Sequence, residues 1–131
     1  MKKITVVRIR KSFGPNVNEE LRWFGNSLGL FGLRDRDSSC YRVFVTLLKR
    51  TKQSQAITSD EIAEKLGLSR GTVVHHLTKL MDAGLVVREK DGYLLRENSL
   101  ENVIGGMRRD LEAAFDELRE VAKEIDDGLG L

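Results

Sequence analysis

The sequence predicts a mainly α-helical fold with one small β-hairpin and a long C-terminal helix. Three observations lead to this prediction. Apolar residues recur at helical spacing in residues 17–27, 39–52 and 58–82, two β-rich runs flank a turn after residue 84, and a further helical repeat covers residues 99–127. With 131 residues, of which 40% are hydrophobic and 32% charged, the chain is long enough for one compact domain and an added helical arm.

Composition excludes several functional classes. No apolar run approaches the roughly 20 residues that span a bilayer, so a cytoplasmic protein without a membrane partner is expected. The single cysteine, Cys40, rules out an internal disulfide and a paired-cysteine metal site. No catalytic triad order, phosphate-binding glycine loop or carboxylate pair is apparent, so we expect no enzyme, no catalytic residues and no cofactor.

Charge is divided unevenly along the chain. Residues 1–98 hold 18 Lys and Arg against 11 Asp and Glu, a net charge of +7, whereas residues 99–131 hold 4 against 9, a net charge of −5. A basic body can approach a polyanion while an acidic tail is kept away from it.

The first 36 residues are expected to support a dimer or to act as an arm. Residues 3–11 alternate apolar and basic side chains and predict a short edge strand. The alternative is an arm that touches DNA backbone through its basic members, Lys2, Lys3, Arg8, Arg10 and Lys11.

After the break at Gly14 and Pro15, a short helix is predicted from about Val17 to Ser27. It leads into an apolar loop that runs through Leu33 and must be covered by the core or by a partner subunit. Trp23 and Phe31 are interpreted as packing residues, with a small apolar effector bound beside them as the alternative.

The junctions of the next helices can be assigned residue by residue. Ser38 is expected to cap a helix over residues 39–52, on whose buried face Cys40 is a small core residue. Thr58 and Glu61 form a capping box at the start of a two-turn helix. Gly67 ends that helix in a left-handed conformation, and Ser69 caps a second helix that continues to Asp82. Two helices joined by such a glycine turn form a helix-turn-helix.

The second helix of this pair has the composition of a DNA recognition helix. An apolar arc of Val73, Val74, Leu77, Leu80 and Met81 faces the core, and the other side carries no acid until Asp82. Hydroxyl, imidazole and cationic groups are those that contact phosphates and base edges. The predicted DNA contacts are Ser69, Arg70, Thr72, His75 and Lys79. Since adjacent histidines point about 100° apart on a helix, no metal site is assigned to His75 and His76, and His76 is taken as a half-buried packing residue.

Two apolar runs follow Gly84 and are separated by a turn placed at Asp91-Gly92, a pair typical of tight hairpins. A hairpin directly after a recognition helix is a wing that reaches neighbouring backbone or minor groove. The basic residues assigned to the wing are Arg88, Lys90 and Arg96.

Residues 40–97, with ITSDEIAEKLGLSRGTVVHHLTKLMDAGLVVREKDGYLLR at their centre, resemble the winged helix-turn-helix of prokaryotic transcription regulators. The likeness is closest to the ArsR-like group, with the MarR-like group next. It implies a DNA-binding regulator, most simply a repressor that blocks polymerase. Metal-sensing ArsR proteins carry a cysteine pair in the helix before the recognition helix, and residues 58–66 contain no cysteine. A winged helix used for protein contact in a transcription or remodelling complex is the alternative.

The last helix carries a heptad-like apolar seam over almost four repeats. Such a helix is longer than a small domain can cover, so a second copy is expected on it. Gly105-Gly106 suggests a kink or a close crossing with another helix. The predicted dimerisation residues are Leu100, Ile104, Met107, Leu111, Phe115, Leu118 and Ile125.

The expected organisation therefore has three parts: residues 1–36, a winged helix-turn-helix DNA-binding domain over residues 37–97, and a dimerisation helix over residues 98–131. Two copies related by a two-fold axis would place their recognition helices in successive major grooves of a pseudo-palindromic operator in double-stranded DNA.

Overall fold

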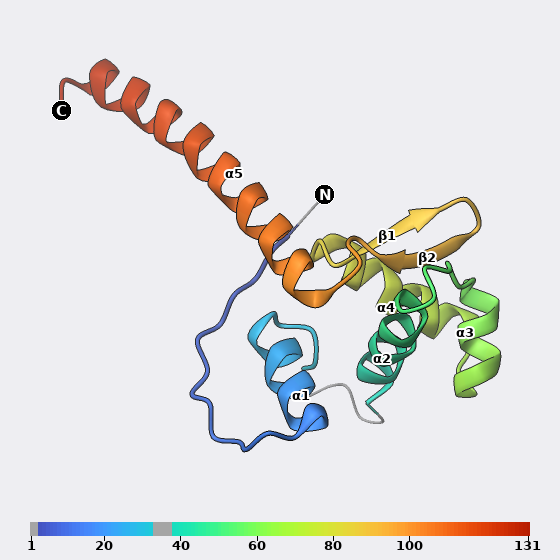
Figure 1. Ribbon diagram of the computed structural model, residues 1–131. Helices are drawn as coiled ribbons and strands as arrows, with labels where there is room; N and C mark the ends of the chain where they lie inside the picture. The colour runs from blue at the N-terminus through green and yellow to red at the C-terminus, as the bar shows by residue number, and fades with distance from the viewer. Residues whose placement is uncertain (1–2, 33–37) are drawn as a thin grey trace.

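The computed structural model describes residues 3–32 and 38–131, so Lys2 and Leu33 lie outside the described residues. The described elements follow in the order α1 (Val17–Ser27), α2 (Ser39–Thr51), α3 (Ser59–Leu66), α4 (Arg70–Asp82), β1 (Val86–Glu89), β2 (Gly92–Leu95) and α5 (Leu100–Leu129). Figure 1 shows a compact group formed by α1–α4 and the hairpin, from which α5 projects. The predicted mainly α fold with a hairpin wing and a long last helix is confirmed.

A single hydrophobic core holds the compact part together. α2 packs against α4 and β2, and α4 packs against α3 and β1. The first turns of α5 and the loop after α1 also contribute to this core. Its fully buried side chains include Leu30, Val43, Phe44, Leu47, Ile57, Ile62, Val73, Leu77, Leu80, Leu85 and Val103. No described helix has the length and apolarity that a bilayer crossing requires.

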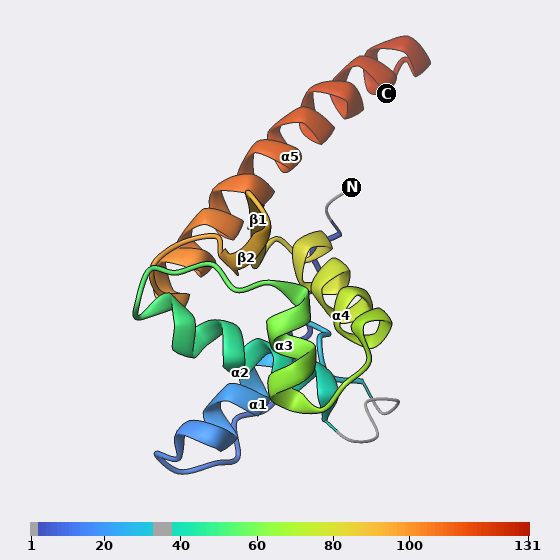
Figure 2. The same cartoon turned by 90° about the vertical axis from the view of Figure 1, so that its right-hand side faces the viewer.

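The predicted junctions of the helix-turn-helix are confirmed. The Thr58 hydroxyl accepts a hydrogen bond from the Glu61 amide at 3.1 Å, and the Glu61 carboxylate accepts one from the Thr58 amide at 3.5 Å. Gly67 has φ +66°, a conformation that side chains disfavour. The Ser69 hydroxyl then accepts from the Thr72 amide at 3.2 Å and starts α4. These local bonds fix the turn that orients α4 against α3 (Figure 2).

The expected cap at Ser38 was wrong. Ser38 precedes α2, but it has φ +55° and its side chain makes no capping hydrogen bond. A capping hydroxyl requires an extended backbone, which brings the oxygen over the free amides of the first turn; the left-handed backbone of Ser38 removes that geometry. The buried face predicted for α2 is confirmed, with Cys40 in the core.

The strand predicted at residues 3–11 was also wrong. The segment is extended but pairs with no strand; its backbone is held by Lys3 N–H to the Asp82 carbonyl and by Val7 N–H to the Ser27 carbonyl, both at 2.7 Å. Ile4 packs partly against the core, whereas Val6, Val7 and Ile9 are exposed. Alternating residues become a strand only where another edge lies alongside, and here the segment runs past α4 and α1 instead (Figure 1).

The hairpin forms as predicted, but its turn is one residue earlier than expected. Glu89 pairs with Gly92, so the two-residue loop is Lys90-Asp91, and Lys90 takes the left-handed conformation at φ +54°. Gly92 is required for another reason. A Cβ at this position would lie 2.7 Å from Ala56 Cβ, because Ile57 forms a bridge with Tyr93 beside it.

The first half of α5 belongs to the domain and the second half extends beyond it (Figure 1). Met107 is only 4% exposed and lies with Val103 in the core, so it was wrongly placed on the dimerisation seam. Leu100 packs partly on the core, and Leu111 is half-buried. All residues after Leu111 are exposed, including Phe115 at 65% and Leu118 at 63%.

Gly106 lets α5 pack closely against Arg96, the residue that follows β2, and not against another helix. A Cβ at Gly106 would lie 2.8 Å from Nη2 of Arg96, whose side chain is 17% exposed. The Arg96 guanidinium donates to the Asp110 carboxylate at 2.5 Å, and this hydrogen bond raises the pKa of Arg96. The Arg96–Asp110 ion pair therefore holds α5 against the end of β2. α5 continues through Gly105 and Gly106 as one helix.

Candidate nucleic-acid interface

The orientation of α4 is set by its buried side. Val73, Leu77 and Leu80 are fully buried against the core. At about 100° per residue, the opposite side must then point away from the domain. The exposed residues of α4 are Arg70, Gly71, Val74, His75, Thr78 and Asp82. We call the first five of these the outer face of α4.

The five residues of the outer face present varied chemistry, and the one exposed acid of α4 is its last residue, Asp82. The Arg70 side chain is 71% exposed, and its Nε lies 3.4 Å from a carboxylate oxygen of Asp60, an exposed pair that contributes little to stability. A Cβ added at Gly71 would have open space around it. Val74, His75 and Thr78 add a methyl surface, an imidazole and a hydroxyl. The face thus combines a cation, polar donors and one apolar patch on a rigid helix.

Of the five predicted contact residues, two lie on the outer face, the exposed Ser69 precedes α4, and Thr72 and Lys79 are half-buried. Arg70 and His75 are exposed there. The hydroxyls of Ser69 and Thr72 lie 2.8 Å apart at the start of the helix, where Ser69 acts as the cap. Lys79 is half-buried, and its Nζ donates to the Leu30 carbonyl at 2.8 Å.

Gly71, Val74 and Thr78 were missed by sequence reasoning. Val74 had been assigned to the apolar arc, but it is exposed. The signal was present: an arc centred on Val73, Leu77 and Leu80 alone leaves Gly71 and Thr78 on the far side of the helix. Including Val74 in the arc shifted its centre and moved the predicted contacts toward Thr72 and Lys79.

The histidine pair separates as predicted. His76 is half-buried, and its Nε2 lies 2.7 Å from the Ser39 hydroxyl, so it joins α4 to α2. The His75 ring is 5.5 Å from that of His76 and stays exposed. Among residues 3–32 and 38–131, no group of three or more His, Cys, Asp or Glu is placed to hold a metal ion.

The wing presents two of its three predicted basic residues. Arg88 is exposed on β1, with its guanidinium carbon 5.8 Å from the centre of the Tyr93 ring. Lys90 is exposed in the turn. Arg96 does not join them, because its guanidinium is engaged by Asp110 on α5.

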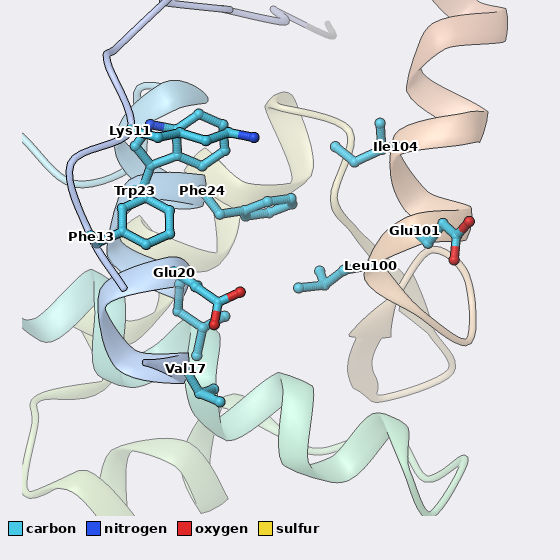
Figure 3. Close-up of a pocket in the computed structure, with 10 residues that line it drawn as sticks. Lys11, Phe13, Val17, Glu20, Trp23, Phe24, Leu100, Glu101 and Ile104 are labelled. Carbon is cyan, nitrogen blue, oxygen red and sulfur yellow. The ribbon is translucent and has the colours of Figure 1, made fainter. Parts of the chain in front are cut away.

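A groove of about 440 Å³ lies between α1 and the first turns of α5. Figure 3 shows Phe13, Trp23 and Phe24 along one wall, facing Leu100 and Ile104 across the opening. Trp23 is fixed by a hydrogen bond from its Nε1 to the Ile9 carbonyl at 3.1 Å, and Lys11 Nζ lies 5.2 Å from the centre of its ring. The groove is mainly apolar, with charged groups at its rim.

Comparison with known proteins identifies the central part of the chain. Residues 47–87 match the family model of the bacterial regulatory proteins of the arsR family. The match runs from the end of α2 through α3 and α4 into β1. No curated protein matches the sequence. The resemblance to ArsR-like regulators is therefore confirmed over this segment, and a helix-turn-helix of this type is that of a DNA-binding transcription regulator.

Proposed function

Because the chain carries a winged helix-turn-helix of the arsR type, we propose that it binds double-stranded DNA sequence-specifically as a homodimeric repressor. The observation that carries this proposal is the outer face of α4, which is held outward by the buried Val73, Leu77 and Leu80 and carries no acid before Asp82. A rigid helix with such a face fits the major groove of B-DNA. Occupation of an operator would block polymerase.

Each residue of the outer face has a role in this geometry. Arg70 can donate two hydrogen bonds to guanine or to a phosphate, and His75 and Thr78 can exchange hydrogen bonds with base edges. Val74 offers a surface for a thymine methyl group. Gly71 has no side chain, so DNA can approach the start of α4 closely. Arg88 and Lys90 on the wing would add contacts to the neighbouring backbone or minor groove.

The second half of α5 supports the homodimer. Thirty residues at 1.5 Å each give a helix of about 45 Å, and every residue beyond Leu111 is exposed, with none of the described segments packed over it. Its exposed apolar residues follow the three- and four-residue spacing of a coiled-coil seam. They are Phe115, Leu118, Val121, Ile125 and Leu129. A stripe of this size in water favours association with a second copy.

The groove beside α1 offers a receiving surface for that second copy. Ile104 lines the groove and is itself exposed on α5, eleven residues before Phe115, so one helix carries both the groove wall and the exposed apolar residues. Residues 112–127 carry seven acids and two bases, whereas the described residues before Glu19 carry only basic charges. Residues 112–127 of the partner's α5 would therefore lie favourably against the basic residues 3–11, which we call the N-terminal segment.

The proposal is tested by titrating a duplex selected for binding from a random pool with the wild-type protein and two arginine variants. Arg70→Met removes the cation of the outer face. Arg108→Met is the matched control, because Arg108 is 81% exposed and its Nε also lies 3.4 Å from a carboxylate, that of Glu112 on α5. Arg70→Met should weaken binding about tenfold, the value of one good contact of 1–3 kcal/mol, while Arg108→Met should bind like the wild type.

Equal binding by both variants would remove α4 from the interface. It would favour a winged helix used for protein contact, for which only weak DNA binding independent of Arg70 is expected.

A further inference from the structure

A second hollow, of about 390 Å³, lies beside the outer face of α4. It is formed by the C-terminal half of α4, the loop after α1 and the start of the N-terminal segment. Its apolar lining is Leu28, Leu30 and Ala83. Its polar and charged lining is Lys3, Thr5, His75, Thr78, Lys79 and Asp82.

Lys79 gives this hollow a fixed positive charge. The ammonium is half-buried and hydrogen-bonded to the Leu30 carbonyl, a neutral acceptor. Within the described part of the chain, no carboxylate lies within 4.0 Å of it to form an ion pair. A partly desolvated charge without a counter-ion is costly. An anion in the hollow would compensate it, and the carbonyl already holds the ammonium in position.

The N-terminal segment brings a second ammonium to the same place. The Lys3 amide donates to the Asp82 carbonyl at the end of α4, and this bond puts the Lys3 side chain on the rim of the hollow. Asp82 contributes one carboxylate to the lining, so two ammonium groups and one carboxylate leave a formal charge of +1. The hydroxyls of Thr5 and Thr78 add neutral donors.

We propose that this hollow binds a phosphate group, and that the group is a backbone phosphate of the DNA bound by α4. The inference rests on the proposed function. His75 and Thr78 belong both to the hollow and to the outer face, so an anion in the hollow lies directly next to the DNA-contacting surface. Lysine ammonium groups act there as point charges, which position the duplex without reading its sequence. The N-terminal segment thereby becomes one side of the DNA interface.

The test measures how duplex affinity depends on salt in Lys3→Met and Lys79→Met. Each lost phosphate contact lowers the slope of log K against log salt by about 0.9. The affinity advantage of the wild type over a variant that has lost the contact should therefore shrink about threefold between 50 and 200 mM salt. Because the two lysines share one phosphate, each single variant should weaken that contact and lower the slope by at most about 0.9, and the double variant, which loses the contact, should lose about 0.9 in slope and not twice that value. Lys49→Met on α2 removes the same charge from an exposed site and should leave the slope unchanged.

Unchanged slopes in Lys3→Met and Lys79→Met would overturn the inference while leaving the proposed function standing, provided that the wild type binds the duplex. A slope that falls by about 1.8 in the double variant would mean that the two lysines contact two separate phosphates, and it would also overturn the shared site. If the Lys79→Met protein unfolds, the salt slope of Lys3→Met still tests the inference, because Lys3 is exposed. The absence of any duplex binding by the wild type would refute the proposed function itself.

The alternative ligand for the hollow is a free phosphate ion, which has the same charge chemistry as a DNA phosphate. Inorganic phosphate, titrated at constant ionic strength, should shift the amide resonances of Thr78 and Lys79 only weakly if the hollow serves DNA. Saturable binding that is lost in the double variant, together with an unchanged DNA salt slope, would assign the hollow to a free phosphate and contradict the inference.

Discussion

Gly105 and Gly106 are neighbours in α5, yet alanine should have opposite effects on stability at the two positions. A Cβ at Gly105 would meet Arg109 Nη1 at 3.6 Å, an ordinary contact. Gly105→Ala should therefore show only the helix-propensity gain, about 0.8–1 kcal/mol. A Cβ at Gly106 would lie 2.8 Å from Arg96 Nη2 and 3.0 Å from its Cζ. Gly106→Ala must then push the guanidinium away from Asp110.

The expected magnitude follows from the Arg96–Asp110 contact. A hydrogen bond to a charged group contributes about 1.5–3 kcal/mol, and the exposure of the Asp110 side chain, 33%, places this pair toward the lower end. After the helix-propensity gain is subtracted, Gly106→Ala should be destabilising by about 1 kcal/mol. The two alanine variants should thus differ by about 2 kcal/mol in the free energy of unfolding.

Urea unfolding followed by circular dichroism, at one fixed protein concentration, measures this difference. The same pair of substitutions in an Arg96→Met background separates the cause. Without the guanidinium, Gly106→Ala should become stabilising by about the Gly105→Ala amount. The Arg96 clash is excluded if both glycine variants change stability in the same direction in the wild type, or if Gly106→Ala stays destabilising in the Arg96→Met protein.

Two further predictions concern the wing and the projecting helix. Gly92→Ala should destabilise the domain by about 1–3 kcal/mol, since its Cβ would lie 2.7 Å from Ala56 Cβ and 3.2 Å from the Ile57 amide nitrogen; an unchanged urea midpoint would contradict the close approach. Leu118→Glu should give monomers in light scattering, because it places a carboxylate on the exposed seam of α5, whereas Ala113→Glu adds the same group to the opposite side and should leave the assembly unchanged. Equal masses for these two variants would exclude the seam as the dimer contact.

The sequence predicted those features that depend on local backbone chemistry. Thr58, Glu61, Gly67 and Ser69 satisfy amides or adopt conformations within a few residues of themselves, and the structure confirms all four roles. The bounds of α1 were also predicted, because the Pro15 break and the helical spacing of its apolar residues are both local.

Features that depend on distant neighbours were not predicted. Residues 3–11 have the alternation of a strand, but no strand edge lies beside them. The Arg96 side chain was assigned to DNA by its charge, yet it is held by a group far away in sequence, the Asp110 carboxylate. The hydrogen bond that positions the Lys79 ammonium, to the Leu30 carbonyl, is equally distant in sequence and was not predicted. A cation can therefore be placed on an interface only once its other possible partners are known.

We propose that the outer face of α4 reads DNA sequence in a two-fold symmetric complex. Selection of bound duplexes from a random pool tests it most directly. A homodimer with two recognition helices should enrich a motif with two inverted half-sites, about 10 base pairs or a multiple of this apart from centre to centre. Arg70→Met should weaken this motif. A pool that shows no enriched motif after repeated rounds, although the protein is folded, would contradict the claim.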